Sequence, residues 1–334
     1  MSINRIYYGK NKVYSFLENG NSGGGESTEC NCEQEYQNGY NEGYNSGYNE
    51  GYNEGQNNCE GGGTVTEGTI LNQIGWTTED EISTMSNAVN YSKQIYENWD
   101  ASITSTYSMF RDDKDLAIFP KVDMSNVEDA TEMFCGCDGL VFLPDLYTPN
   151  LITANDMFNS CKTLLTAPRL NTEKCQSFSQ TFTGCNNLRE TPNWDFSNAI
   201  SMYCTFRDCY RLKELIFDAP LCNEYQQLCA FSFIPKIIID ATSCNNIGEF
   251  FGWYGDTNGG TTYLLAKNLK TNWDDDNGFY ACPNISYDCI KEQIIQLANV
   301  GGDTKTLKIH PNTMSLLSTD DIKEATNKGW IITA

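Results

Sequence analysis

Apolar positions between residues 124 and 215 recur with a period of 24 residues. Each unit has a phenylalanine, a cysteine three residues later and a leucine after three more, and three of the four units add a proline four residues on. Four copies in unbroken register predict an α/β repeat solenoid, in which each unit buries its apolar face against its neighbours. The repeating core positions are Phe134, Phe158, Phe182, Phe206, Cys137, Cys161, Cys185, Cys209, Leu140, Leu164, Leu188 and Leu212.

The Leu-x-x-x-Pro-x-Leu part of each unit is short and extended, and we place a strand there. Coils that stack by strand pairing lie about 4.8 Å apart. The cysteines then form a narrow column inside the stack, where a thin apolar side chain fits. We expect free thiols, because the 15 cysteines are an odd number and the chain shows no secretory signal.

A helical cap is predicted over residues 64–118. Thr78 and Glu81 have the spacing of a capping box, and an apolar stripe follows at three- and four-residue steps. This pattern predicts one amphipathic helix of about 20 residues that covers the first coil of a repeat domain spanning residues 119–334. The stripe consists of Ile82, Met85, Val89, Tyr96 and Trp99, widened by Ala88 and Ile95.

Two segments of different composition precede this helix. In residues 1–20, one or two short strands are predicted around a turn at residues 9–11. Residues 21–63 contain five Tyr-x-x-Gly units, whose strict period favours a helical stalk in which glycine lets two or three chains approach closely. The alternative is a disordered spacer, because glycine and asparagine are poor helix formers. The candidate oligomerisation residues are Tyr36, Tyr40, Gly43, Tyr44, Gly47, Tyr48, Gly51 and Tyr52.

The charge balance excludes some classes of partner. With 44 acidic and 22 basic residues, the formal net charge is −22, and so acidic a chain is repelled by nucleic-acid phosphates and by anionic membranes. We find neither a membrane-spanning apolar run nor a secretory signal, so we expect a protein made in a bacterial cytoplasm and kept there or released by lysis. The single histidine, His310, excludes a multi-histidine metal centre, and we expect no metal and no cofactor.

After Leu212 the repeat register degrades, and aromatic residues gather in two stretches, 250–263 and 273–280. Loops between coils often carry function, and Trp or Tyr beside Asn or Asp can stack on sugar rings or anchor a protein contact. The alternative is that these aromatics seal an irregular end of the core. The acidic run at 274–276 does not fit a calcium loop, because Asn284 stands where a carboxylate is needed. The candidate receptor-binding residues are Phe251, Trp253, Tyr254, Tyr263, Trp273 and Tyr280.

The repeat motif carries a family resemblance. Phe-x-x-Cys-x-x-Leu, with Ser125-Asn126-Val127 ahead of Met133-Phe134, resembles the BspA-like leucine-rich repeats of bacterial surface proteins. The stretch from Ser318 to Trp330 is similar to the closing helix and strand of such proteins in Bacteroides and their phages. The resemblance covers residues 78–334 and implies a leucine-rich-repeat-like fold that serves as an interaction scaffold. Independently of it, Ser318 or Thr319 is expected to cap a short helix that Gly329 ends.

The N-terminal stretch resembles a different group of proteins. Ile6-Tyr-Tyr-Gly-Lys-Asn-Lys-Val13 looks like the openings of virion proteins of Bacteroides (crAss-like) phages. Together with the stalk, this resemblance implies a phage fibre protein, a homotrimer anchored in the virion by its N-terminus that presents the repeat domain to a host-surface glycan or protein. The alternatives are a bacterial BspA-like adhesin and a capsule-degrading fibre. We expect no enzyme, because no P-loop, dinucleotide or Gly-x-Ser-x-Gly motif is present and His310 has no evident partner.

Overall fold

The computed structural model describes residues 4–8, 12–16, 79–252 and 260–334. The chain divides into two compact units, residues 1–90 and 91–334. In the first unit, β1 (Asn4–Tyr8) and β2 (Lys12–Phe16) pair as antiparallel strands, so the short strands predicted near the N-terminus are present. The Tyr-x-x-Gly units, and with them all the candidate oligomerisation residues, lie outside the described residues.

Helix α4 (Glu79–Glu97) has 19 residues and confirms the predicted helix of about 20 residues that follows Thr78. Its last turns belong to the second unit, where Ile95 is buried in the core and the Tyr91 hydroxyl donates to the Asp113 carboxylate. Residues 98–118 are not helical, which corrects the prediction for this stretch.

Residues 98–118 form most of an additional coil at the start of the stack. Ser105 of this coil bridges in parallel to Asp129, and the Phe110 ring stacks on Phe134 with a centroid distance of 5.9 Å. The coil repeats the phenylalanine, leucine and proline of the motif 24 residues earlier, but Asp113 stands where the other copies carry cysteine. This single replacement hid the copy from the sequence pattern.

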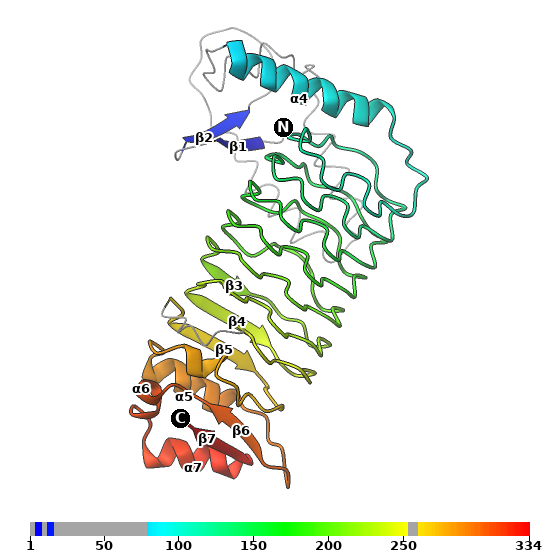
Figure 1. The fold of residues 1–334 in the computed structure, drawn as a ribbon. Coiled ribbons are helices and arrows are strands. Elements are labelled where there is room, and N and C mark those ends of the chain that lie inside the picture. Colours follow the sequence, from blue (N-terminus) through cyan, green and yellow to red (C-terminus); the bar gives the residue numbers. More distant parts are fainter. Residues whose placement is uncertain (1–3, 9–11, 17–78, 253–259) are drawn as a thin grey trace, which may run out of the picture. The chain divides into compact units, whose positions relative to one another are not determined.

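Successive coils of the second unit stack with their chains parallel (Figure 1). The repeating phenylalanines and cysteines of the core are called here the ladder residues. The amide of each ladder phenylalanine donates to a carbonyl of the next coil, as from Phe134 to Met157 at 2.9 Å. Parallel bridges also join equivalent positions, 24 residues apart up to Ser201 and 22 or 23 apart beyond it. One repeat of the sequence is therefore one coil of the stack. The bridged positions are Ser105, Asp129, Thr153, Ser177, Ser201, Glu224 and Asn246.

Among the described coils, regular strands occupy the predicted position only late in the stack. There β3 (Glu214–Ile216), β4 (Lys236–Asp240) and β5 (Tyr263–Lys267) form a parallel sheet in that order. In the four earlier coils the position that corresponds to Ile216 carries proline. Proline has no N–H to donate to a neighbouring strand, so pairing there is limited to isolated bridges and single hydrogen bonds.

Stacked phenylalanine rings form the centre of the core. The rings of Phe134, Phe158, Phe182 and Phe206 follow one another at centroid distances of 5.6 Å, with planes within 13° of parallel. All four are fully buried. Because each of these rings contacts the equivalent ring of the coil before it, the 24-residue period and the packing of the core are the same feature.

The cysteine column lies beside these rings and supplies hydrogen-bond donors. The Cys185 thiol donates to the carbonyl oxygen of Phe158 at 3.0 Å, and the other three ladder cysteines make the same contact. One coil further, Ser232 replaces the cysteine and donates to Phe206 at 2.8 Å. The twelve cysteines of the described part are all free. Each carbonyl that accepts from a ladder cysteine also accepts from a backbone amide, so cysteine acts here as a thin buried side chain that gives the carbonyl a second donor.

Two left-handed backbone positions shape the turn around each ladder phenylalanine. The residue two before it has φ between 52° and 59° in successive coils, from Ser108 to Glu249. The residue two after it also has positive φ, and this position is glycine at Gly136 and Gly184. The next residue points inward as the ladder cysteine, and the one after that lies at the surface.

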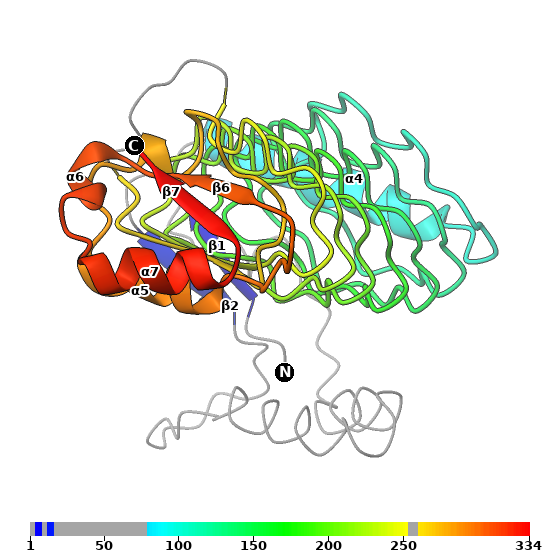
Figure 2. The same ribbon diagram turned by 90° about the horizontal axis from the view of Figure 1, so that it is seen from below.

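The chain after β5 closes the stack with short elements (Figure 2). Helix α5 (Tyr287–Gln296) contacts β5 and α7 (Thr319–Asn327), α7 also contacts β7 (Trp330–Thr333), and β6 (Lys305–Lys308) pairs in parallel with β7. Of the two predicted caps of α7, Ser318 is the one used, and Gly329 follows the helix with φ of +87°. Within the described ranges, no helix has the length and apolar character needed to cross a membrane. This part of the chain also contains η1 (Phe279–Ala281) and α6 (Pro311–Met314).

Candidate interaction surface

One outward-facing column of residues changes its chemistry along the stack. It lies four residues after the phenylalanine of each coil, or after Cys229 in the coil that follows Phe206, and begins with alternating charges. Asp138 lies 3.2 Å from the ammonium group of Lys114 and 3.6 Å from that of Lys162, so the early part of the column is paired within itself. The column then reaches Tyr210 and Phe233, whose side chains are 52% and 55% exposed.

Tyr210 and Phe233 lie at equivalent positions of consecutive coils. The register is fixed next to them, because the Cys209 amide donates to the Ser232 hydroxyl at 2.9 Å. The ladder side chains beside them point into the core, while these two aromatic side chains face solvent. Two large aromatic side chains are therefore available on one edge of the stack.

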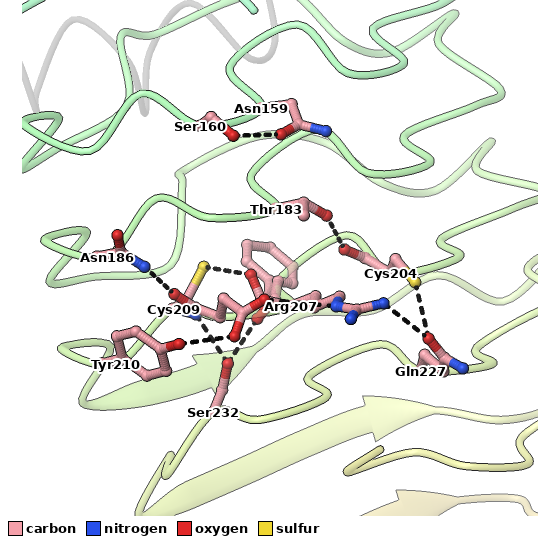
Figure 3. A network of polar contacts seen from close by, with 12 residues as sticks. Asn159, Ser160, Thr183, Asn186, Cys204, Arg207, Cys209, Tyr210, Gln227 and Ser232 are labelled. Atoms are coloured by element: carbon pink, nitrogen blue, oxygen red, sulfur yellow. Dashed lines mark hydrogen bonds and ion pairs between the residues drawn. The ribbon is translucent and has the colours of Figure 1, made fainter. Parts of the chain in front are cut away.

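Arg207 joins two coils next to Tyr210 (Figure 3). Its guanidinium lies over the Phe231 ring, 5.1 Å from the centroid, and it donates to the Gln227 side-chain oxygen at 3.3 Å and to the Asp208 carboxylate at 3.4 Å. The Tyr210 hydroxyl donates to the same carboxylate at 2.8 Å, and this hydrogen bond raises the pKa of Tyr210. The network anchors the Tyr210 side chain on a rigid part of the stack.

Two cations follow Tyr210 closely in the sequence. Arg211 and Lys213 are exposed, and within the described part of the chain neither side chain has a hydrogen-bond or ion-pair partner. The stretch 207–213 carries three basic residues and one acidic residue, in a chain with a net charge of −22. This edge is therefore locally cationic on a strongly acidic protein.

Two of the predicted receptor-binding residues lie in the core instead. Trp273 is 1% exposed, and its ring packs edge-on against Phe250 and Phe279, both at centroid distances of 5.1 Å. Gly278 permits this packing, since a Cβ there would lie 2.0 Å from the indole nitrogen. Phe251 is 7% exposed. A receptor cannot reach either ring, so both residues are corrected to the alternative role of sealing the core.

The other predicted residues do not come together in one site. Tyr263 is partly buried in β5 and packs against the core. Tyr280 is half-buried, with the Lys308 ammonium 4.6 Å above its ring. Trp253 and Tyr254 lie outside the described residues.

Two titratable side chains near the C-terminal end have structural partners. Asp275 accepts hydrogen bonds from the amides of Glu249 at 2.7 Å and Asn277 at 3.0 Å, while burial raises its pKa. His310 caps α6, because its Nδ1 accepts from the Asn312 amide at 3.1 Å. In the described segments, no three His, Cys, Asp or Glu side chains cluster as metal ligands do.

The buried thiols are poor nucleophiles. Burial raises the pKa of Cys137 and Cys175 to about 12 and that of Cys222 to about 11. Nucleophilic and metal-binding chemistry both need the thiolate, which these side chains do not form near neutral pH. Their role is therefore packing and hydrogen bonding.

Sequence reasoning did not single out Tyr210 and Phe233. It searched for binding residues where the repeat breaks, whereas Tyr210 lies within the fourth regular copy of the motif. The sequence did contain a signal for Tyr210. The position four residues after the phenylalanine is Lys, Asp, Lys and Asn in the four earlier coils, and it is aromatic from Tyr210 onward. An aromatic residue in a polar surface column is more informative than one in an irregular loop.

Comparison with known proteins gives one match. None of the curated proteins and none of the solved structures is significantly similar to the chain. Residues 80–219, which include α4 and the early coils, match the family described as "Mycoplasma protein of unknown function, DUF285". This match is compatible with a BspA-like surface repeat protein.

Proposed function

We propose that this chain is a non-enzymatic attachment protein, in which a leucine-rich-repeat-like solenoid presents its edge to a bacterial cell surface. The observation that supports this most directly is the exposed pair Tyr210 and Phe233, with the unpartnered Arg211 and Lys213 beside it. Tyr and Arg are the side chains that most often dominate binding energy at interfaces. The family match at residues 80–219 agrees with a role at a surface.

The finer proposal is a phage fibre. Residues 1–20 would anchor the chain in the virion, residues 21–63 would form a trimeric stalk, and the repeat domain would face the host. The resemblances at Ile6–Val13 and at Ser318–Trp330 support this placement. The second candidate is a BspA-like adhesin on a bacterial cell, which the family match also fits. Peptides of this chain in purified virions favour the fibre, and their presence in a bacterial envelope fraction favours the adhesin.

The attachment function is tested with the full chain, labelled with a fluorophore, on a panel of Bacteroides strains. We expect saturable binding to some of the strains and no release of reducing sugar ends from their capsules. If the chain binds none of the strains, the proposed attachment function is contradicted. Release of reducing ends supports the capsule-degrading alternative instead.

A further inference from the structure

We propose that the surface formed by Tyr210, Arg211, Lys213 and Phe233, called here the aromatic–cationic patch, binds an acidic polysaccharide whose sugar rings carry carboxylates. This inference rests on the proposed attachment function and names the class of ligand for that surface. It depends on three observations, which concern the ring faces, the charges and the main chain around the patch.

The ring faces come first. Tyr210 and Phe233 are more than half exposed, and they lie on neighbouring coils of a stack whose paired chains are about 4.8 Å apart. The apolar face of a sugar ring packs on an aromatic ring, while its hydroxyl groups stay in water. Because Asp208 and the Arg207 network already hold the Tyr210 side chain, binding costs little side-chain entropy.

The charges select an acidic ligand. Arg211 and Lys213 have no described partner, whereas the nearby Lys236 lies 3.9 Å from the Glu214 carboxylate. A carboxylate on a sugar next to the stacked ring can pair with the two available cations, and a guanidinium can do so through two hydrogen bonds. The net charge of −22 repels the same polyanion from the rest of the chain, so binding is confined to this patch.

The main chain around the patch disfavours an acidic peptide. Extended peptides commonly bind by adding a strand to a free sheet edge. Here Glu214 of β3 pairs in register with Lys236 of β4, and its carbonyl also accepts a hydrogen bond from the Thr191 hydroxyl at 2.7 Å. With those backbone groups occupied, the patch offers a ligand only aromatic faces and positive charge.

The test measures binding of the full chain to polygalacturonate, its methyl ester and poly-L-glutamate by biolayer interferometry. The methyl ester keeps the sugar ring and removes the charge, while poly-L-glutamate keeps the charge and removes the ring. We expect binding to polygalacturonate alone, weakening as salt rises because the ion pairs are exposed. The Tyr210→Ala variant should weaken binding about tenfold, and Arg211→Gln with Lys213→Gln should do the same.

Matched variants separate the patch from general effects on the surface. Tyr107→Ala removes another tyrosine that is 61% exposed, in the first coil, and Lys323→Gln removes an exposed cation in α7. Both should bind polygalacturonate as the unmodified chain does. Circular dichroism checks that every variant keeps its fold, which the exposure of the altered side chains favours.

The following outcomes overturn the proposal: no binding to polygalacturonate, equally tight binding of the methyl ester or of poly-L-glutamate, or patch variants that bind unchanged. Equal binding of poly-L-glutamate would indicate an acidic protein partner.

Measuring binding to cells distinguishes failure of the patch proposal from failure of the attachment function. If the Tyr210→Ala, Phe233→Ala double variant binds cells as well as the unmodified chain, attachment stands and the patch is rejected. If the unmodified chain binds polygalacturonate but no cell, the patch stands and attachment is rejected.

Discussion

The early coils, which carry Phe110, Phe134, Phe158 and Phe182, and the later coils, which begin with the coil of Phe206, stack in the same way but present different surfaces. In the early coils the column after the phenylalanine is paired within itself, as Asp138 is with Lys114 and Lys162. In the later coils the same column carries the exposed Tyr210 and Phe233. The difference shows that contacts between equivalent core residues hold the coils together. The residues of an outer column can therefore change from paired charges to exposed aromatic rings without altering the stacking.

The largest expected effect concerns the shared core. Replacing Phe158 with alanine removes a ring that stacks on both neighbours and should lower the free energy of unfolding by about 3–5 kcal/mol. Replacing the exposed Phe233 with alanine should change it by no more than about 0.5 kcal/mol. Urea unfolding followed by circular dichroism measures both. Equal losses for the two variants would show that the outer column also holds the stack together.

The next effect concerns the cysteine column. Cys185→Ala removes one of the two hydrogen bonds that the buried carbonyl of Phe158 accepts, since the Cys161 amide still donates to it, and together with the small cavity this should cost about 1–2 kcal/mol. Cys185→Ser keeps a donor, as Ser232 does naturally in the later coils, and should cost less than the alanine variant. The same unfolding measurement ranks the two variants. A serine variant as unstable as the alanine variant would mean that volume, and not hydrogen bonding, selects cysteine in the early coils.

A smaller effect is expected where α4 meets the first coil. The hydrogen bond from Tyr91 to Asp113 raises the pKa of Tyr91 from its ordinary value of 10 to about 12. The protonated phenol is therefore favoured in the folded state, so the contribution is complete below pH 10 and is lost as the pH rises through 12. Tyr91→Phe should cost about 1 kcal/mol at pH 8.

The alkaline range gives this prediction its control. The difference in unfolding free energy between Tyr91→Phe and the unmodified chain should shrink between pH 10 and 12. The exposed Tyr107 lies in the same coil, and Tyr107→Phe should show no such trend. A difference that stays constant across this range would mean that Asp113 does not hold Tyr91.

The smallest effect belongs to the early surface column. Asp138→Asn removes the carboxylate that pairs with Lys114 and Lys162, and it should change the free energy of unfolding by less than about 1 kcal/mol, because exposed ion pairs are weak. It should also leave binding to polygalacturonate unchanged, since the proposed ligand contacts the later coils. A marked change in binding would show that the early column takes part in recognition.

Much of the coil architecture followed from the sequence, but the boundaries of its elements did not. The period identified the ladder residues, all of which are buried. Asp113 in place of cysteine concealed the first coil, and residues 98–118 were assigned to the helical cap segment instead. Strands were expected in every coil, yet proline removes the donor that regular pairing needs, and Ile216 marks the point where a strand forms.

The candidate site was much less predictable. Aromatics in the irregular part of the sequence were natural candidates, but Trp273 and Phe251 are buried there. Burial of an aromatic residue depends on which segments pack over it, and in this part of the chain the spacing no longer says which segments are neighbours. Tyr210 was overlooked for the opposite reason, since its position in a regular copy suggested a structural role.

The sequence by itself determined the length of the coil, the residues that form the core columns and the acidic character of the chain. It could do so because identical side chains at a fixed period meet one another once the chain is wound. Only the tertiary structure decided which aromatic residues face solvent and which cations remain without a partner. Exposure and pairing depend on contacts between coils and on the shape of each turn, and a linear pattern does not contain that information.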